Sequence, residues 1–175
     1  MKNTLLLLAF LIFTGISAQE KKDYSKHVAS IDSTVATLYA VISGDKGEAR
    51  DWDLFKHLFY KDAKLIATGK YEKKQTTLRY MSSEDYIKFS EKWLMDNGFH
   101  ELEIKRDTQT FGNIAHVLST YEAYNSKDDD TPLIRGINSI QLFNDGKRWW
   151  IVNLYWNQES KEIPVPEDHL SKSSN

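Results

Sequence analysis

The sequence predicts an α+β domain in which helices pack on one face of an antiparallel sheet. Two observations support this fold class. Apolar residues at three- and four-residue steps fall within the first 100 residues, where they indicate helices. From His100 onward, long alternating runs meet at Gly112-Asn113 and at Asp145-Gly146, as expected of two β-hairpins.

Two helices are expected at the start of the domain. Within residues 28–42 the apolar positions 28, 31, 35, 38 and 42 lie on one helical face. Gly44 follows and provides a natural end for this helix. Asp51 then precedes a second, shorter helix at residues 52–60, and its carboxylate is the expected N-cap.

A short strand and a third helix come next. Residues 63–69 are expected to form the strand, which leads into a polar loop running through Thr77. Ser82 or Ser83 then caps the third helix, which ends at Gly98. One stripe of this helix is aromatic and consists of Tyr86, Phe89 and Trp93.

Four long strands complete the expected domain. They cover residues 100–111, 114–124, 134–144 and 147–156, and they form the two hairpins described above. The connection between the hairpins, residues 126–132, is charged and therefore solvated. The sequence contains no internal repeat and no domain linker, so we expect one domain.

The first 18 residues have the pattern of a secretory signal peptide. Lys2 precedes an uncharged run, and the small pair Ser17-Ala18 provides a cleavage site. This run is shorter than the roughly 20 apolar residues that a membrane-spanning helix needs. We therefore expect an exported protein, periplasmic or secreted, without stable membrane insertion. Its expected parts are a loose segment at 19–27, the domain at 28–158 and a flexible tail at 159–175.

Composition excludes several kinds of site. The chain has no cysteine, which excludes disulfides, thiolate zinc sites and cysteine nucleophiles. Its five histidines lack the H-E-x-x-H spacing, so we expect neither a metal site nor another cofactor. A net charge of −2 gives no reason to expect nucleic-acid binding. Aromatic residues make up 13% of the chain and predict a large core, a lined cavity or an interface.

Two motifs, together with the order of elements between them, resemble the NTF2-like superfamily, in particular SnoaL-like (DUF4440-type) proteins. DWDLFKHLFYKDAKLI at 51–66 is similar to the point where a short helix ends and Asp-Ala enters the first strand. DGKRWWIV at 145–152 resembles the family's terminal strand, with Trp149 and Ile151 in the characteristic places. The resemblance implies an NTF2-like cone, in which a curved sheet wraps around the helices. It implies no single activity, because members include isomerases, dehydratases, cyclases and non-catalytic binders.

The last hairpin separates two faces. A two-residue turn at Asp145-Gly146 pairs Asn138 with Asn153 and places both on one face with Ile151 and Tyr155. The resemblance puts Ile151 against the helices, so that the two asparagines and Tyr155 stand where the cone opens. An unpartnered buried amide costs about 1–3 kcal/mol. The asparagines are therefore expected either to bond each other and hold the sheet, or to bind a ligand.

The preceding hairpin completes the expected cavity. Pairing Phe111 with Ile114 places Arg106 on the inner face and Glu103 on the solvated face, so the inner strand faces offer no acid. The remaining inner residues are Leu102, Ile104, Val117, Ser119 and Tyr121. Aromatic residues from the N-terminal segments face the sheet, either as core or as cavity lining. The expected ligand-binding residues are Asn138, Asn153, Tyr155, Tyr121, Ser119, Trp52, Tyr60 and Trp93.

The opposite face of the last hairpin is too apolar for water. Contiguous apolar patches of this kind usually mark an interface, and NTF2-like sheets commonly pair through this face. We therefore expect a homodimer. The expected interface residues are Trp150, Val152, Leu154, Trp156, Ile137 and Phe143.

Three interpretations of function remain open. The first is a domain that binds a small, largely apolar molecule. The second is a cofactor-free isomerase, dehydratase or cyclase, which requires a general base in the cone. His57 and Asp53 are the candidates, although a lone histidine in an aromatic helix is more often structural. The third is a non-catalytic dimeric interaction module whose cavity is filled by side chains.

Overall fold

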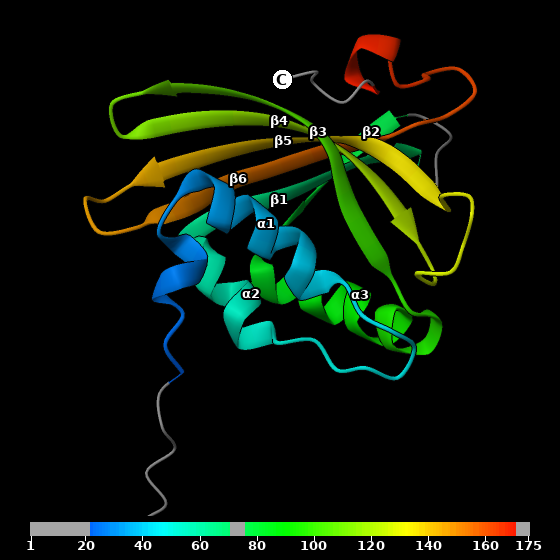
Figure 1. Cartoon of the computed structure of the whole chain (residues 1–175), viewed down its shortest axis with the longest axis horizontal. Helices are drawn as coiled ribbons and strands as arrows, with labels where there is room; N and C mark the ends of the chain where they lie inside the picture. Colours follow the sequence, from blue (N-terminus) through cyan, green and yellow to red (C-terminus); the bar gives the residue numbers. More distant parts are fainter. Residues whose placement is uncertain (1–21, 71–75, 171–175) are drawn as a thin grey trace, which may run out of the picture.

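The computed structural model describes residues 22–70 and 76–170. The expected signal peptide and the last five residues of the expected tail lie outside these ranges. Helices and strands follow in an order that puts most of the helical structure before the long hairpins (Figure 1). The elements are η1 (Ser25–Val28), α1 (Ile31–Ile42), α2 (Trp52–Leu58), β1 (Phe59–Lys70), β2 (Thr76–Met81), α3 (Ser83–Asn97), β3 (His100–Phe111), β4 (Ile114–Tyr124), β5 (Ile134–Asn144), β6 (Trp149–Gln158) and η2 (Glu167–His169).

The six strands form one curved sheet with the order β2-β1-β6-β5-β4-β3. Neighbouring strands are antiparallel except β1 and β6, which run parallel. The sheet is therefore mixed, whereas the sequence predicted an antiparallel one. Figure 1 shows α1, α2 and α3 together on one side of the sheet, which curves over them. The α+β class and the cone-like arrangement are confirmed.

Side-chain caps define where the helices begin. Ser30 and Ser33 form a reciprocal capping box on α1, and Ser82 and Asp85 form another on α3. On α2 the amide of Leu54 donates to the Asp51 carboxylate at 3.0 Å, as the sequence predicted. Each cap satisfies a backbone N–H that has no partner within its helix.

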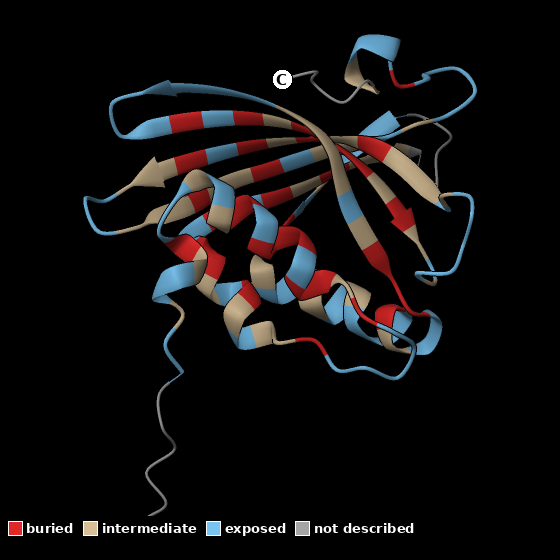
Figure 2. Cartoon of the chain, viewed as in Figure 1, coloured by how far each residue is buried: buried red, intermediate tan, exposed pale blue. Residues whose placement is uncertain are grey.

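The core lies between the helices and the concave face of the sheet, where buried positions alternate along parts of β1, β4 and β5 (Figure 2). Full burial of a large apolar side chain contributes about 1.5–3 kcal/mol, and these positions dominate the stability of the fold. The most deeply buried apolar residues include Val35, Leu38, Phe55, Leu58, Leu65, Val117, Ile140, Leu142 and Ile151.

A bulge in β6 reverses part of the predicted register. The closing pair of the hairpin is Asn144 with Trp149, so the loop has four residues rather than two. The register then shifts between Gln141 and Leu142, and beyond it Asn138 lies opposite Trp156 instead of Asn153. An extra residue in one strand exchanges the faces of all residues that follow it.

A second bulge changes β3 in the same way. Phe111 pairs with Ile114 as predicted, and Arg106 lies opposite Ser119 on the concave face. The register shifts between Glu103 and Lys105, so that Glu103 faces inward beside Tyr121. The predicted inward position of Leu102 was wrong, because its side chain is 56% exposed on the outer face.

Two further segments differ from the expectations. Residues 76–81, of which the first two were expected to end a polar loop, form β2 at the edge of the sheet. Residues 159–170, expected within a flexible tail, follow a defined path on the side of the sheet away from the helices (Figure 1). Val165 is buried there, and its amide donates to Glu159 at 3.0 Å.

Candidate functional site

A cavity of about 460 Å³ opens between α3, the end of α1 and the concave face of the sheet. Its volume is within the range of small-molecule sites. Most of its wall is apolar, with aliphatic residues from α1 and from several strands. The aromatic part of the wall includes Tyr86, Phe89, Trp93, Phe99, Tyr121 and Trp156.

Glu101 is the one acidic residue of this wall among the described residues, and sequence reasoning missed it. It precedes the bulge in β3 and lies opposite Ala123, on the concave face. It also borders a second, shallower hollow of about 660 Å³ beneath α1. The strict alternation assumed for β3 treated Leu102 as inward and therefore placed Glu101 outside.

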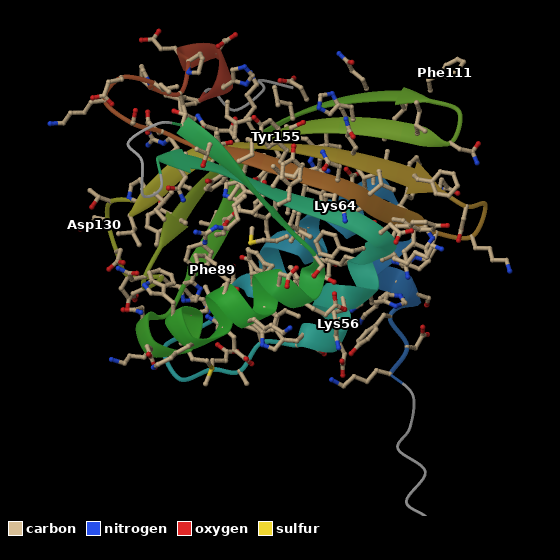
Figure 3. The ribbon with its side chains drawn as sticks, turned by 180° about the vertical axis from the view of Figure 1, so that it is seen from behind. Lys56, Lys64, Phe89, Phe111, Asp130 and Tyr155 are labelled. Atoms are coloured by element: carbon tan, nitrogen blue, oxygen red, sulfur yellow. The ribbon has the colours of Figure 1, made fainter. Side chains whose placement is uncertain are left out.

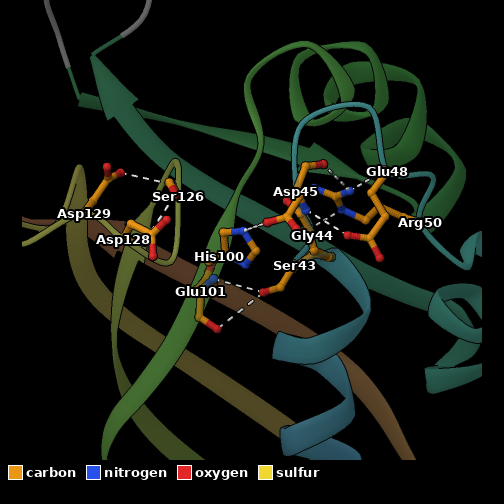
Figure 4. A network of polar contacts seen from close by, with 11 residues as sticks. Ser43, Gly44, Asp45, Glu48, Arg50, His100, Glu101, Ser126, Asp128 and Asp129 are labelled. Carbon is orange, nitrogen blue, oxygen red and sulfur yellow. Dashed lines mark hydrogen bonds and ion pairs between the residues drawn. The ribbon is translucent and has the colours of Figure 1, made fainter.

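The backbone around Glu101 is held by the end of α1 and the loop that follows (Figure 4). The amide of Glu101 donates to Ser43 Oγ at 2.9 Å. The neighbouring His100 is buried, and its Nε2 lies 2.9 Å from Asp45 Oδ1. These contacts fix the start of β3, and therefore the position of the Glu101 carboxyl, relative to α1.

A chain of hydrogen bonds leads from Glu101 into the core. Asn138 Nδ2 lies 3.4 Å from Glu101 Oε1 and donates to the Tyr39 hydroxyl at 3.0 Å. The Tyr39 hydroxyl lies 2.6 Å from Ser119 Oγ, which in turn donates to Glu103 Oε1. Asn138, Tyr39 and Ser119 are all buried. Buried polar groups need such partners, so the chain stabilises the helix–sheet contact as well as the cavity wall.

The series of hydrogen bonds ends at an ion pair between Glu103 and Arg106. Arg106 donates to both carboxylate oxygens of Glu103, at 2.8 and 2.5 Å, and to Asp32 on α1 at 2.6 Å. The charge of Glu103 is thus balanced within its own strand. Glu101 has no such partner: within residues 22–70 and 76–170 no ion pair includes it.

Burial determines the electrostatics of Glu101. Removal from water raises the pKa of its carboxyl to about 7, while the hydrogen bond from Asn138 acts in the opposite direction. Burial first, and then the negative charge of Glu101, raise the pKa of the hydroxyls of Tyr39, Tyr86 and Tyr121. Three neutral phenols therefore surround one carboxyl that can ionise near neutral pH.

Three of the predicted binding residues line the cavity. Asn138 and Tyr121 extend from the concave strand faces, and Trp93 extends from α3. The predicted pairing of Asn138 with Asn153 was wrong, since Asn138 bonds Tyr39 and Glu101 instead. Ser119 lies beneath Tyr39 in the core and is not part of the wall.

The other predicted binding residues lie elsewhere. The β6 bulge places Asn153 and Tyr155 on the convex face, and Figure 3 shows Tyr155 on that side of the sheet. Trp52 packs edge-on against Phe55 and donates to Glu91 at 2.8 Å. Tyr60 contacts the rings of Phe143 and Trp150 on the convex face.

The two candidate bases predicted from the sequence are outside the cavity. His57 Nε2 lies 2.6 Å from Arg148 Nη1, and its ring contacts Tyr24 and Trp150. Asp53 is exposed on α2 and pairs with Lys56 at 3.0 Å. Neither side chain faces the space where a ligand would bind. The described residues contain no group of three or more potential metal ligands.

The β6 bulge places the residues of the expected dimer interface on two different faces of the sheet. Trp150, Val152, Ile137 and Phe143 are half-buried on the convex face. Leu154 and Trp156 instead line the cavity, so they do not lie on the face for which the interface was predicted. On the convex face, three apolar and aromatic residues form a row across β2, β1 and β6, in which Ile66 lies opposite both Tyr80 and Tyr155.

Comparison with solved structures confirms the NTF2-like fold. A scytalone dehydratase-like protein from Novosphingobium aromaticivorans has 11% identity and a TM-score of 0.56, over 75% of this chain and 83% of that one. A ketosteroid isomerase-like protein from Parabacteroides distasonis has 16% identity and a TM-score of 0.51, over 76% and 91%. An NTF2-like protein of unknown function from Silicibacter pomeroyi has 16% identity and a TM-score of 0.52, over 79% and 100%.

These likenesses establish the fold and not an activity, because identity is low. No protein-family model matches the sequence, and no curated protein matches it. In the part of the chain that the structure describes, no helix is long and apolar enough to cross a membrane.

Proposed function

We propose that this protein binds a small, largely apolar molecule in the cavity between α3 and the concave face of the sheet. The observation that carries the proposal is an open space of about 460 Å³ with aromatic walls and a cluster of polar groups at Glu101 and Asn138. Apolar pockets with a few convergent polar groups are the usual form of small-molecule sites. An interaction module with a filled cavity is less well supported, because the aromatic side chains leave this space open.

The test uses a pair of neighbouring substitutions on β1. Ala67 lines the cavity, while Ile66 faces the convex side. Ala67→Phe is expected to fill the space and weaken binding of the neutral fluorophore N-phenyl-1-naphthylamine at least tenfold. Ile66→Phe is the matched control and is expected to leave binding unchanged. Equal binding by both variants, with thermal unfolding showing that both are folded, would exclude the cavity as the site.

A second candidate function is acid–base catalysis of the isomerase or lyase kind. Glu101 supplies what His57 and Asp53 do not, a carboxyl inside the apolar cavity with its pKa raised to about 7. A general base works best when its pKa is close to the working pH. Tyr121 in the same wall offers a hydroxyl donor for a developing oxyanion. The fold neighbours with isomerase-like and dehydratase-like names support this candidate by analogy only.

Proton exchange tests this second candidate without a known substrate. The protein would be incubated in D₂O with a β,γ-unsaturated cyclic ketone, and loss of the α-proton would be followed by NMR. A rate that exceeds the buffer rate and disappears in Glu101→Gln supports catalysis. A rate equal to buffer leaves the binding function as the only one of the two that the cavity supports.

We also propose that two copies associate through the convex face. The support is the row formed by Tyr80, Ile66 and Tyr155, in which the two tyrosines are 63% and 38% exposed. Tyr155→Glu is expected to convert a dimer to a monomer in sedimentation velocity. Phe111→Glu, at the far tip of the β3–β4 hairpin (Figure 3), is the control and should leave the dimer intact.

Export is the remaining proposal and depends on the sequence of the first 18 residues. Lys2, the uncharged run and Ser17-Ala18 support cleavage by a signal peptidase. N-terminal sequencing of protein recovered from an exporting bacterial host tests it. A mature chain that starts at Gln19 is expected, and an intact N-terminus in the cytoplasm would contradict the proposal.

A further inference from the structure

Glu101 is a carboxyl in a largely aromatic cavity, and no ion pair within the described residues includes it, although Arg79 lines the same cavity over the Phe89 ring. Its one side-chain hydrogen bond within the described residues comes from Asn138 at 3.4 Å, which is long. By contrast, Glu103, on the same strand, has a bidentate arginine. An ionised carboxylate in such a place is unfavourable unless it gains a partner of opposite charge. The fold provides that partner for Glu103 and leaves the corresponding space beside Glu101 open to a ligand.

Asn138, a polar residue of the same cavity wall, also presents an acceptor. Asn138 directs its Nδ2 toward Glu101 and Tyr39, so the network fixes the orientation of the amide. Its carbonyl oxygen takes no hydrogen bond from the described residues. Together, the carboxylate and this carbonyl form a cluster that favours a hydrogen-bond donor.

The surrounding rings favour the same ligand chemistry. Tyr86 lies against Phe55 with ring centroids 5.2 Å apart and meets the ring of Trp156 edge-on at 6.4 Å. Aromatic faces attract cations, by about 0.5–1 kcal/mol at exposed sites and more where water is excluded. A carboxylate-bearing ligand would instead be repelled by Glu101.

From these three features we infer that the cavity selects an organic cation, a protonated amine on an apolar body, whose ammonium group lies between Glu101, Asn138 and the aromatic wall. This inference rests on the proposed binding function and names its ligand class. The apolar body would occupy the space toward Phe89 and Trp93 on α3, which line the same cavity.

Several ionisable groups face Glu101 or its cavity. Tyr39, Tyr86 and Tyr121 have raised pKa values and stay neutral in the relevant range. Arg79 on β2 lines the cavity and lies over the Phe89 ring. Glu103 is paired with Arg106. The adjacent hollow under α1 adds His100, Lys127 and Asp129. A comparison with Glu101→Gln separates the effect of Glu101 from that of all these groups.

The experiment compares three probes of similar shape by isothermal titration calorimetry: 4-phenylbutylamine, 4-phenylbutan-1-ol and 4-phenylbutanoate. At pH 8 the amine is expected to bind at least tenfold more tightly than the alcohol, and the acid more weakly than either. Glu101→Gln should remove the preference for the amine while retaining alcohol binding, which also shows that the variant is folded. Because protonation of Glu101 removes its charge, the wild-type preference should decline as pH falls from 8 to 6.

The outcomes separate this inference from the proposed function. If the alcohol binds as tightly as the amine, or if Glu101→Gln keeps the preference for the amine, the inference is overturned and the binding function stands. If the wild-type protein binds none of the three probes, both are overturned.

Discussion

The hydroxyl of Tyr39 on α1 lies 2.6 Å from Ser119 Oγ on β4, and both residues are buried. Tyr39 also accepts a hydrogen bond from Asn138. Tyr39→Phe removes this shared atom, so that Asn138 Nδ2 keeps only its long contact with Glu101 and Ser119 Oγ keeps only its bond to Glu103. A lost buried hydrogen bond costs about 0.5–1.5 kcal/mol, so we expect a clear loss in the free energy of unfolding, measured by urea titration.

The control for this prediction is a double-mutant cycle. Ser119→Ala removes the contacts with Tyr39 and Glu103 but should cost less than Tyr39→Phe, because Asn138 keeps its bond to Tyr39 and Glu103 keeps its bonds from Arg106. The double variant should be destabilised by less than the sum of the two single changes, since both remove the same bond. Strictly additive effects would show that the two residues are not coupled in solution.

The raised pKa of Glu101 predicts that stability depends on pH. The pKa is higher in the folded protein, about 7, than the ordinary value of 4.5, so the folded state holds this proton more tightly than the unfolded state. The contribution is fully present below about pH 4.5 and is lost as pH rises through 7. We expect this change to be on the order of 1–3 kcal/mol, measured as the free energy of unfolding across the pH range.

Glu101→Gln identifies the group responsible. The glutamine has almost the same shape and does not ionise, so the decline in stability between pH 4.5 and 7 should become smaller. An unchanged pH profile in this variant would assign the decline to other groups and contradict the burial of a protonatable carboxyl at this position.

The β6 bulge predicts different roles for two neighbouring residues. Trp156 lines the cavity, whereas Tyr155 lies on the convex face. Trp156→Phe should weaken binding of N-phenyl-1-naphthylamine several-fold, because it removes part of the cavity wall. Tyr155→Phe should leave this affinity unchanged, as read by fluorescence titration. The reverse result would mean that β6 keeps a regular alternation.

The ion pair between Glu103 and Arg106 predicts that replacing the arginine will destabilise the fold, because the charge left on Glu103 is partly buried. Arg106→Met keeps much of the side-chain volume but leaves the Glu103 carboxylate without its bidentate partner. We expect a loss of about 1–3 kcal/mol in the free energy of unfolding, because one half of a poorly solvated ion pair remains. Thermal or urea unfolding measures it.

Asp32 provides the matched control for that pair. It contacts the same arginine, but its side chain is 90% exposed. Exposed ion pairs contribute little, so Asp32→Asn should have a much smaller effect than Arg106→Met. Equal effects would indicate that the contact on α1, and not the pair within β3, determines the stability contributed by Arg106.

Local patterns in the sequence were sufficient to predict the class of fold. The helical steps of residues 28–42, the caps at Asp51 and Ser82 and the two hairpins each depend on neighbouring residues, and the structure contains them, although the loop of the second hairpin has four residues rather than two. Asn138, Tyr121 and Trp93 were also placed correctly toward the cavity. The sequence also contained a local sign of the β6 bulge. Strict alternation placed the polar Asn153 inward and the apolar Leu154 outward, and a bulge before them reverses both positions.

The sequence by itself determined the helices, the hairpins and the abundance of aromatic residues. Tertiary structure alone decided which carboxyl enters the cavity. One extra residue in β3 and another in β6 exchange the faces of their strands, which brings Glu101 and Trp156 inside and moves Asn153 and Tyr155 outside. The physical reason is that a bulge depends on the pairing of one strand with its neighbours and on the apolar surface they bury together, which are contacts between residues far apart in the chain.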